Sequence, residues 1–384
     1  MRPRPAQKTV DGAIERLHTL RARWHRQPGV TAVDVGFKIT EDVMTEEVAL
    51  RVHVERKIPV DELPESQRFN VSGGPTTEVD GYKVDVIEAS YGVLRNQTIS
   101  VLPTVAGRLA LEDDAPRVDR RALLRPLLGG ISCGNPRITS GTIGAIVFHR
   151  RTCKPMILSN WHVLAGDRVA ATGEPIVQPG PTDGGRAGDE VARLSAMVLD
   201  SRMDAAVAEI EEGIATEREL LGLGTITGTE TARLGTKVAK SGRTTSLTKG
   251  IVDGVSLSTR INYGGGVAQS FVNQIRIVPR PPWPAINDEI SSGGDSGSVW
   301  INEANNRALG LHFAGENDPA VSAENAIASP IDPIMDEFGI SFAPVVYSGR
   351  DRAFDLCREF PFLCEPQFDE LRRLLERLGD RLVP

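Results

Sequence analysis

Apolar residues recur at two different periods along the chain, and the change of period marks the predicted domains. Near the start they follow helical spacing, which predicts an amphipathic helix that a Gln-Pro-Gly sequence ends. Three runs typical of strands follow, beginning at Val30, Glu47 and Gly81, and the first two alternate apolar and polar residues. We therefore expect a small α+β domain over residues 1–95, with His53 on the surface of its sheet.

Beyond residue 128 the pattern changes to short apolar strands bounded by glycine. Runs such as TIGAIVFHR, DAAVAEI and ALGLHFAG predict a mainly β sandwich or barrel rather than alternating strands and helices. We assign this β domain to residues 129–344, with a connector over 96–128 and a C-terminal helical tail over 345–384. The tail has an apolar stripe typical of a packed or self-associating helix, so a homo-oligomer is left open; the stripe comprises Phe368, Leu371, Leu374, Leu375, Leu378 and Leu382.

Composition and charge exclude several classes of protein. The net charge of −7 provides no concentrated basic face for nucleic acid, and no run approaches the roughly 20 apolar residues of a membrane span. The basic first residues are followed by no apolar segment or small-residue cleavage site, so we expect a cytoplasmic protein. No CxxC pair is present, so we expect no metal and no cofactor. Whether the cysteines form disulfides is left open; they are Cys133, Cys153, Cys357 and Cys364.

A glycine-rich loop carries the first candidate for chemistry, Gly293-Gly294-Asp295-Ser296-Gly297-Ser298. A serine hydroxyl is a poor nucleophile at neutral pH and needs an adjacent base. Acyl transfer also needs backbone N–H groups directed at the developing oxyanion, and glycines on both sides of Ser296 allow the backbone conformations that direct them inward. Asp295 is suited to anchor the loop from inside by a charge-assisted hydrogen bond. Such turns are common, so the loop needs partners to be informative.

Two other segments supply the partners that this serine would need. In ILSNWHVLA an apolar strand leads into His162, and in MDAAVAEI Asp204 opens an otherwise apolar strand. A carboxylate at that position is expected to be at least partly buried. A buried carboxylate needs a hydrogen-bond partner, and the ring N–H of a histidine is a suitable one.

In this order and spacing, the SNWHV and GGDSGS motifs and the later GLHFAG strand resemble the chymotrypsin-like serine peptidases. The resemblance covers residues 129–343 and implies a chymotrypsin-like double β-barrel in which Ser296 attacks the scissile carbonyl, His162 carries its proton and Asp204 orients the histidine. It also implies an oxyanion hole formed by the N–H groups of Gly294 and Ser296, and a protein or peptide substrate. More narrowly, RPLLGGISCG and the runs after it, preceded by a small α+β domain, resemble the trypsin-like proteases related to the plant Narrow Leaf protein.

The resemblance also places three residues in a specificity pocket. Ile290 would lie at its base, where a preference for Lys or Arg requires an acidic residue, so that preference is not expected. His312 would lie on the strand lining the pocket, where together with Ser291 it is suited to hydrogen-bond a glutamate or glutamine side chain before the cleaved bond. The alternative is a histidine that merely fills a strand end. No site for an activating cut is marked, so any activation is expected to depend on the first domain or on assembly.

Three functions from different classes remain open from the sequence. The first is an active serine endopeptidase. The second is a binding or scaffold protein that keeps the barrel without turnover, and the third is a protease that cuts only its own chain. A serine-directed probe and the mass of the intact chain would separate them.

Overall fold

The computed structural model describes residues 6–40, 43–58, 62, 78–93, 118–280, 289–316 and 324–344, together with 370, 371 and 373. The predicted tail stripe, Cys357 and Cys364 therefore lie largely or wholly outside the described residues. Within them, Cys133 and Cys153 are not joined by a disulfide. No helix in these ranges has the length and apolar character needed to cross a membrane.

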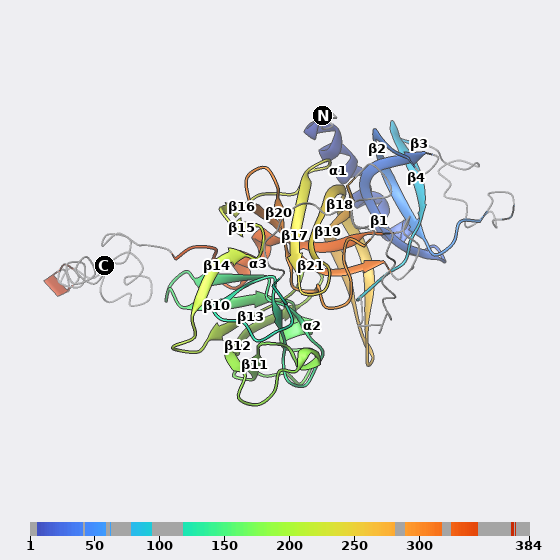
Figure 1. Ribbon diagram of the computed structural model, residues 1–384. Coiled ribbons are helices and arrows are strands. Elements are labelled where there is room, and N and C mark those ends of the chain that lie inside the picture. Colours follow the sequence, from blue (N-terminus) through green and yellow to red (C-terminus); the bar gives the residue numbers. More distant parts are fainter. Residues whose placement is uncertain are drawn as a thin grey trace.

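Six antiparallel strands form one sheet of the β domain, in the order β11-β12-β13-β10-β9-β23. Figure 1 labels four of them, β10 to β13. Their bounds, in that order, are Pro175–Val177, Glu190–Leu199, Asp204–Ile210, Pro155–Ser159, Ala145–His149 and Ile340–Ser341. Successive side chains of a strand point to opposite faces. Ile157 and Ala206 accordingly enter one apolar cluster, whereas Leu158 and Val207 enter a second cluster shared with the other half of the domain. Both faces of β10 and β13 are buried over most of their length, which explains why these two strands are mainly apolar.

Six strands of the second half pair in a closed cycle, β17-β20-β21-β22-β19-β18 and back to β17. Their bounds, in that order, are Lys237–Gly242, Val299–Asn302, Arg307–Glu316, Ala326–Pro330, Val267–Pro279 and Ser246–Gly264. Closed pairing defines a barrel. The pairing of the first sheet does not close within the described part of the chain. Of the expected double barrel, the described strands thus show one closed cycle of hydrogen-bonded strands and one open sheet packed against it, and the second barrel stays a prediction.

Short elements connect the two halves of the β domain. One of them is the helix α3 (Ile331–Glu337), whose buried side chains join the cluster between the halves. The remaining elements are α2 (Trp161–Leu164), the 3-10 turn η2 (Pro181–Asp183), β6 (Leu127–Gly129), β7 (Ser132–Cys133), β8 (Gly141–Thr142), β14 (Thr216–Leu220), β15 (Gly224–Thr225) and β16 (Gly228–Thr229).

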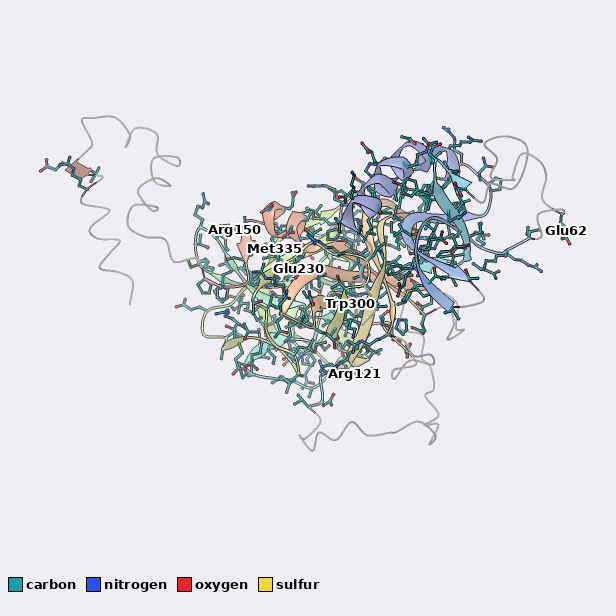
Figure 2. All side chains as sticks on the ribbon, turned by 90° about the horizontal axis from the view of Figure 1, so that it is seen from above. Glu62, Arg121, Arg150, Glu230, Trp300 and Met335 are labelled. Atoms are coloured by element: carbon teal, nitrogen blue, oxygen red, sulfur yellow. The ribbon has the colours of Figure 1, made fainter. Side chains whose placement is uncertain are left out.

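The N-terminal elements continue the sheet of the barrel. They comprise α1 (Gln7–Trp24), β1 (Val30–Thr40), β2 (Val43–Val54), β3 (Glu78–Val79), β4 (Tyr82–Glu88) and β5 (Tyr91–Gly92), so the predicted helix and three strand runs are confirmed. β1 pairs antiparallel with β18, which joins β1, β2, β4 and β3 to the barrel sheet and sets these elements beside β18 and β19 (Figure 1). With β5 and β16, which both pair with β21, the sheet has 12 strands. Leu17 of α1 lies in the same apolar cluster as Trp300 of β20, which is buried in the middle of the molecule (Figure 2).

Buried charges occupy the joint between β1, β2 and β18. The Arg51 guanidinium donates to the Asp34 carboxylate and, at 2.8 Å, to Asp253 Oδ2, and none of the three side chains is more than 1% exposed. A Cβ atom at Gly36 would clash with this guanidinium, so glycine leaves the space that the ion pair fills. His53 was predicted on the sheet surface and is instead fully buried, with Nε2 3.0 Å from Asp34 Oδ1. Its alternation with apolar neighbours was misleading because both faces of β2 are covered.

Candidate active site

The candidate base and its candidate orienting group come from paired strands of the open sheet. β10 ends at Ser159 and leads directly into α2, which carries His162, and Asp204 is the first residue of β13. Ser159 lies opposite Ala206 in the ladder between β10 and β13. The side chains of His162 and Asp204, which lie just beyond this pair, therefore meet at one end of the sheet. His162 Nδ1 lies 2.5 Å from Asp204 Oδ2, and the His162 backbone N–H donates to Oδ1 at 3.3 Å. The Asp204 carboxylate, which was predicted to be at least partly buried, is fully buried, and the His162 side chain is 12% exposed.

A tyrosine that sequence reasoning missed also binds the Asp204 carboxylate. The hydroxyl of Tyr263, near the end of β18, donates to Asp204 Oδ2 at 2.7 Å, and its ring centroid lies 5.6 Å from that of His162. Burial, the Asp204 charge and the hydrogen bond to it all raise the pKa of Tyr263 well above its usual range, so the phenol is a neutral donor. No local motif marks Tyr263, because its role depends on how a long hairpin folds over the other half of the domain.

The loop carrying Ser296 lies against the strand β8 of the first half. The Thr142 N–H donates to the Ser296 carbonyl at 2.9 Å, and the Thr142 hydroxyl donates to the Gly294 carbonyl at 2.8 Å. A Cβ atom at Gly141 would clash with Val163, the neighbour of His162, and would lie 3.1 Å from the Ser296 carbonyl oxygen. The serine loop and the turn with His162 therefore abut the same strand.

Two of the three predicted catalytic residues are thus hydrogen-bonded to each other, and the third lies on an adjoining loop. No hydrogen bond joins the Ser296 hydroxyl to His162. Among the described residues, His162 Nε2 has no hydrogen-bond partner. With Nδ1 held by Asp204, Nε2 is the ring nitrogen left to exchange a proton with another group.

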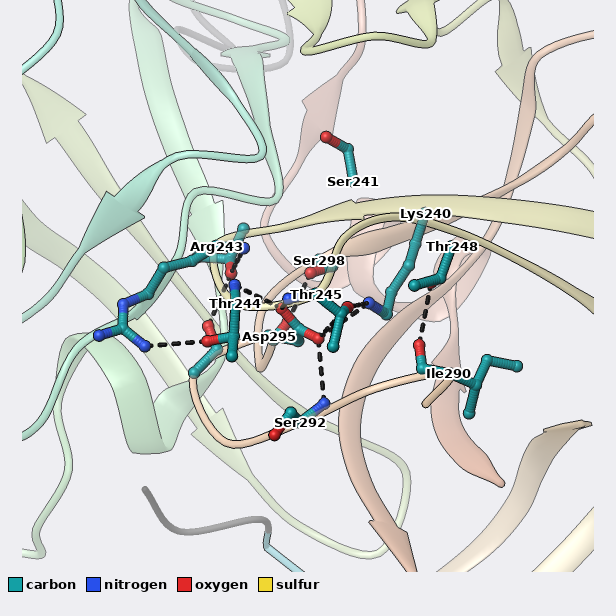
Figure 3. Close-up of polar contacts among 12 residues, drawn as sticks. Lys240, Ser241, Arg243, Thr244, Thr245, Thr248, Ile290, Ser292, Asp295 and Ser298 are labelled. Atoms are coloured by element: carbon teal, nitrogen blue, oxygen red, sulfur yellow. Dashed lines mark hydrogen bonds and ion pairs between the residues drawn. The ribbon is translucent and has the colours of Figure 1, made fainter. Parts of the chain in front are cut away.

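Asp295 anchors the serine loop from inside, which confirms the sequence-based expectation (Figure 3). Its fully buried carboxylate accepts from Lys240 Nζ at 3.0 Å and from the Thr245 hydroxyl at 2.5 Å, and three backbone N–H groups of the surrounding loops also donate to it. Burial by itself would raise the pKa of Asp295, but the Lys240 charge and these hydrogen bonds outweigh it and hold the pKa at about 2. Lys240 is fully buried, and sequence reasoning missed it. Its ammonium group compensates the charge of the buried Asp295 carboxylate from within the chain.

The two predicted oxyanion donors lie in a backbone segment that requires glycine. Gly294 has a φ of 100°, and a Cβ atom there would clash with the Arg243 guanidinium. In the part of the chain that the structure describes, neither the N–H of Gly294 nor that of Ser296 donates to a protein acceptor. Both N–H groups remain to bind an anionic oxygen.

The three predicted pocket residues are all buried near the serine loop. Ile290 is held by its backbone. Its N–H donates to Glu324 Oε2 at 3.0 Å. Its carbonyl accepts from the Thr248 hydroxyl at 2.9 Å (Figure 3). Ser291 and His312 are each 1% exposed. Within the described ranges, neither Ser291 Oγ nor His312 Nδ1 has a hydrogen-bond partner.

Burial shifts the pKa values of three titratable side chains around this pocket, His312, Glu316 and Glu324. Burial, aided by the nearby Lys240 charge, lowers the pKa of His312 to about 3, so its imidazole is neutral at physiological pH. Burial raises the pKa of Glu316 to about 7 and, together with the Glu316 charge, that of Glu324 to about 8. Sequence reasoning missed both glutamates: Glu316 directly follows the GLHFAG run, and Glu324 lies in a segment without a motif.

Solved serine proteases of the chymotrypsin fold are similar to this chain over a little more than half its length. A glutamic-acid-specific serine protease, described as using a histidine triad in substrate binding, is 21% identical with a TM-score of 0.42; the match covers 56% of this chain and 99% of that one. Thermobifida fusca protease A is 20% identical with a TM-score of 0.40, covering 57% and 98%. Nocardiopsis protease is 16% identical with a TM-score of 0.40, covering 56% and 97%.

No protein-family model and no curated protein matches the chain. The narrower resemblance to relatives of the Narrow Leaf protein is not tested by these similarities and stays a prediction.

Proposed function

We propose that this protein is a serine endopeptidase that forms an acyl-enzyme on Ser296. The observation that supports it most directly is the contact between His162 Nδ1 and the fully buried Asp204 carboxylate, beside a serine loop that the Asp295–Lys240 pair holds in place. A buried carboxylate bound to Nδ1 fixes the imidazole tautomer and stabilises the imidazolium that forms during acyl transfer.

In the proposed mechanism, the Ser296 hydroxyl attacks the scissile carbonyl while His162 Nε2 accepts its proton. The N–H groups of Gly294 and Ser296 stabilise the oxyanion, a contribution of about 10²–10³-fold per donor in related chemistry. The imidazolium then protonates the leaving amine, and a water molecule repeats the sequence on the acyl-enzyme. Lys240 keeps the loop ordered without a preceding cut, because it compensates the charge of Asp295 internally.

We further propose a preference for glutamine or glutamate before the scissile bond. The buried Ser291 Oγ and His312 Nδ1, neither of which has a partner within the described ranges, are groups that a side-chain amide or carboxyl can satisfy. A neutral His312 provides no positive charge, and Glu324 adds an acidic group beside Ile290. Glutamine should therefore be favoured over glutamate, the more so above pH 8.

The expectation that Lys and Arg are not preferred before the scissile bond rested on Ile290 alone. Glu324 lies beside Ile290 and supplies an acidic group that could bind such a side chain. A digest of a peptide library at pH 6 and pH 9 tests both points. Cleavage after Lys or Arg would show that Glu324 acts as the acidic base of the pocket.

Labelling with a small fluorophosphonate tests the activity itself. Wild type and Ser292→Ala, a change in the same loop that keeps the Ser292 N–H bound to Asp295, should be labelled, whereas Ser296→Ala and His162→Ala should not. Folded wild-type protein that resists the probe between pH 7 and 9 would contradict the proposal and favour the scaffold alternative.

A further inference from the structure

One edge of strand β21 is open beside the candidate nucleophile. β20 pairs with β21 only as far as Leu311, whereas β22 pairs along the other edge as far as Gly315. The Gly297 N–H, next to Ser296, donates to the His312 carbonyl at 2.9 Å. The uncovered part of β21 therefore starts next to the serine loop, and an open strand edge is a template for an extended peptide.

The N-terminal part of the same chain already lies on this edge. β5 pairs antiparallel with β21, with Gly92 opposite Gly315 and Tyr91 opposite Glu316. Because Gly315 pairs with β22 on its other side, β5 lies on the edge that β20 leaves uncovered. Because the pairing is antiparallel, the direction from Tyr91 to Gly92 runs toward His312 of β21, and hence toward the serine loop. A peptide substrate paired with this edge would follow the same course.

Buried contacts fix β5 in this position. Tyr91 is 7% exposed and packs in an apolar cluster with Phe313 and Ala314 of β21, and Val93 packs against the same cluster. The Tyr91 hydroxyl is hydrogen-bonded to His53 Nδ1, and His53 is in turn bound to the buried Asp34. The ion-pair network at the β1–β2 joint thus reaches, through one tyrosine, to the edge of the active site.

We propose that β5 occupies the strand position at which a peptide substrate pairs with β21, so that the N-terminal elements inhibit the active site in cis. The inference rests on the proposed peptidase function. It assigns the N-terminal elements a regulatory role, because a substrate must displace β5 before it can lie along β21.

The test compares Gly92→Pro with Gly92→Ala in the full-length chain. Proline has no N–H to give to a ladder and disfavours a paired strand. Alanine keeps the N–H, and Gly92 does not have a positive φ, so its backbone accepts alanine. Hydrogen exchange of the segment 312–316 reports the pairing without reference to catalysis. Turnover of an internally quenched peptide with glutamine at the intended cleavage point reports access to the site.

In Gly92→Pro, the amides of the segment 312–316 that face β5 should exchange at least tenfold faster than in wild type. KM for the quenched peptide should fall by a similar factor, with kcat unchanged. Gly92→Ala should resemble wild type. If Gly92→Pro fails to fold, Tyr91→Phe, which removes only the hydroxyl bound to His53, should shift KM in the same direction by a smaller factor.

Fluorophosphonate labelling of all variants with unchanged KM would overturn the inhibition and leave the peptidase intact. Faster exchange with no labelling of any variant would overturn both, since no activity would then exist to inhibit. Unchanged exchange in folded Gly92→Pro would show that β5 is not held by this pairing, and would overturn the inhibition alone.

Discussion

Removing the Tyr263 hydroxyl is the most informative single change at the candidate active site. Tyr263→Phe deletes the donor that lies 2.7 Å from Asp204 Oδ2 and keeps the ring whose centroid lies 5.6 Å from that of His162. The Asp204 carboxylate retains two other contacts, from His162 Nδ1 and the His162 backbone N–H. The perturbation is therefore confined to one charge-assisted hydrogen bond.

Its magnitude follows from the charge on the acceptor. A hydrogen bond to a charged group contributes about 1.5–3 kcal/mol, and about 1.4 kcal/mol corresponds to a tenfold change in rate. We expect kcat to fall about 10- to 100-fold in Tyr263→Phe, since a less firmly held Asp204 orients the imidazole less well. A carboxylate with one donor fewer attracts the imidazolium proton more strongly, so the acid limb of the kcat/KM profile should move to higher pH.

The assay is kcat/KM between pH 5 and 9 for wild type, Tyr263→Phe and the control Tyr82→Phe. The control makes the same chemical change in β4, remote from the site, and should behave as wild type. A Tyr263→Phe protein within twofold of wild type with an unshifted acid limb would refute the reasoning. A lowered melting temperature with an unshifted acid limb of the kcat/KM profile would show that Tyr263 contributes only to stability.

Three further substitutions test the loop and the pocket. Lys240→Met leaves the Asp295 charge buried without its cation and should destabilise the protein by about 3–5 kcal/mol in chemical denaturation. Because the pKa of Asp295 is depressed to about 2, the wild-type pair should stabilise the fold above about pH 4 and lose that contribution as the pH falls toward 2, which unfolding measured from pH 2 to 6 would show. Gly294→Ala should abolish most fluorophosphonate labelling, since a Cβ atom would meet Arg243 at a positive φ; Gly213→Ala, with a similar φ but open space around it, should be labelled normally. Glu316 has its pKa raised to about 7 by burial, so wild type should lose on the order of 2 kcal/mol of stability between pH 5 and 8, and Glu316→Gln should not; equal pH dependence of the two proteins would contradict this.

The local sequence was sufficient to predict the main helices and strands and to name the candidate catalytic residues. Helical and strand periods in the sequence predicted α1 and the strands around it, because burial of one face imposes the period of the element that carries it. The residue types at His162, Asp204 and Ser296, with the resemblance that their motifs and order carry, predicted a nucleophile, a base and an orienting carboxylate, and these roles stay predictions. The burial of Asp204 and the anchoring by Asp295 also followed, since a carboxylate in an apolar strand or a glycine-rich turn must find a partner.

The partners themselves were decided only by tertiary structure. Lys240 meets Asp295, and Tyr263 meets Asp204, across 55 and 59 residues of chain, and neither contact has a periodicity or spacing that marks it. The pairing of β1 with β18 and of β5 with β21 depends on strand register and on which edges the barrel leaves open. Local patterns determine which face of a strand is apolar, whereas the neighbour at a strand's edge is selected by backbone hydrogen bonds, which carry no side-chain signature.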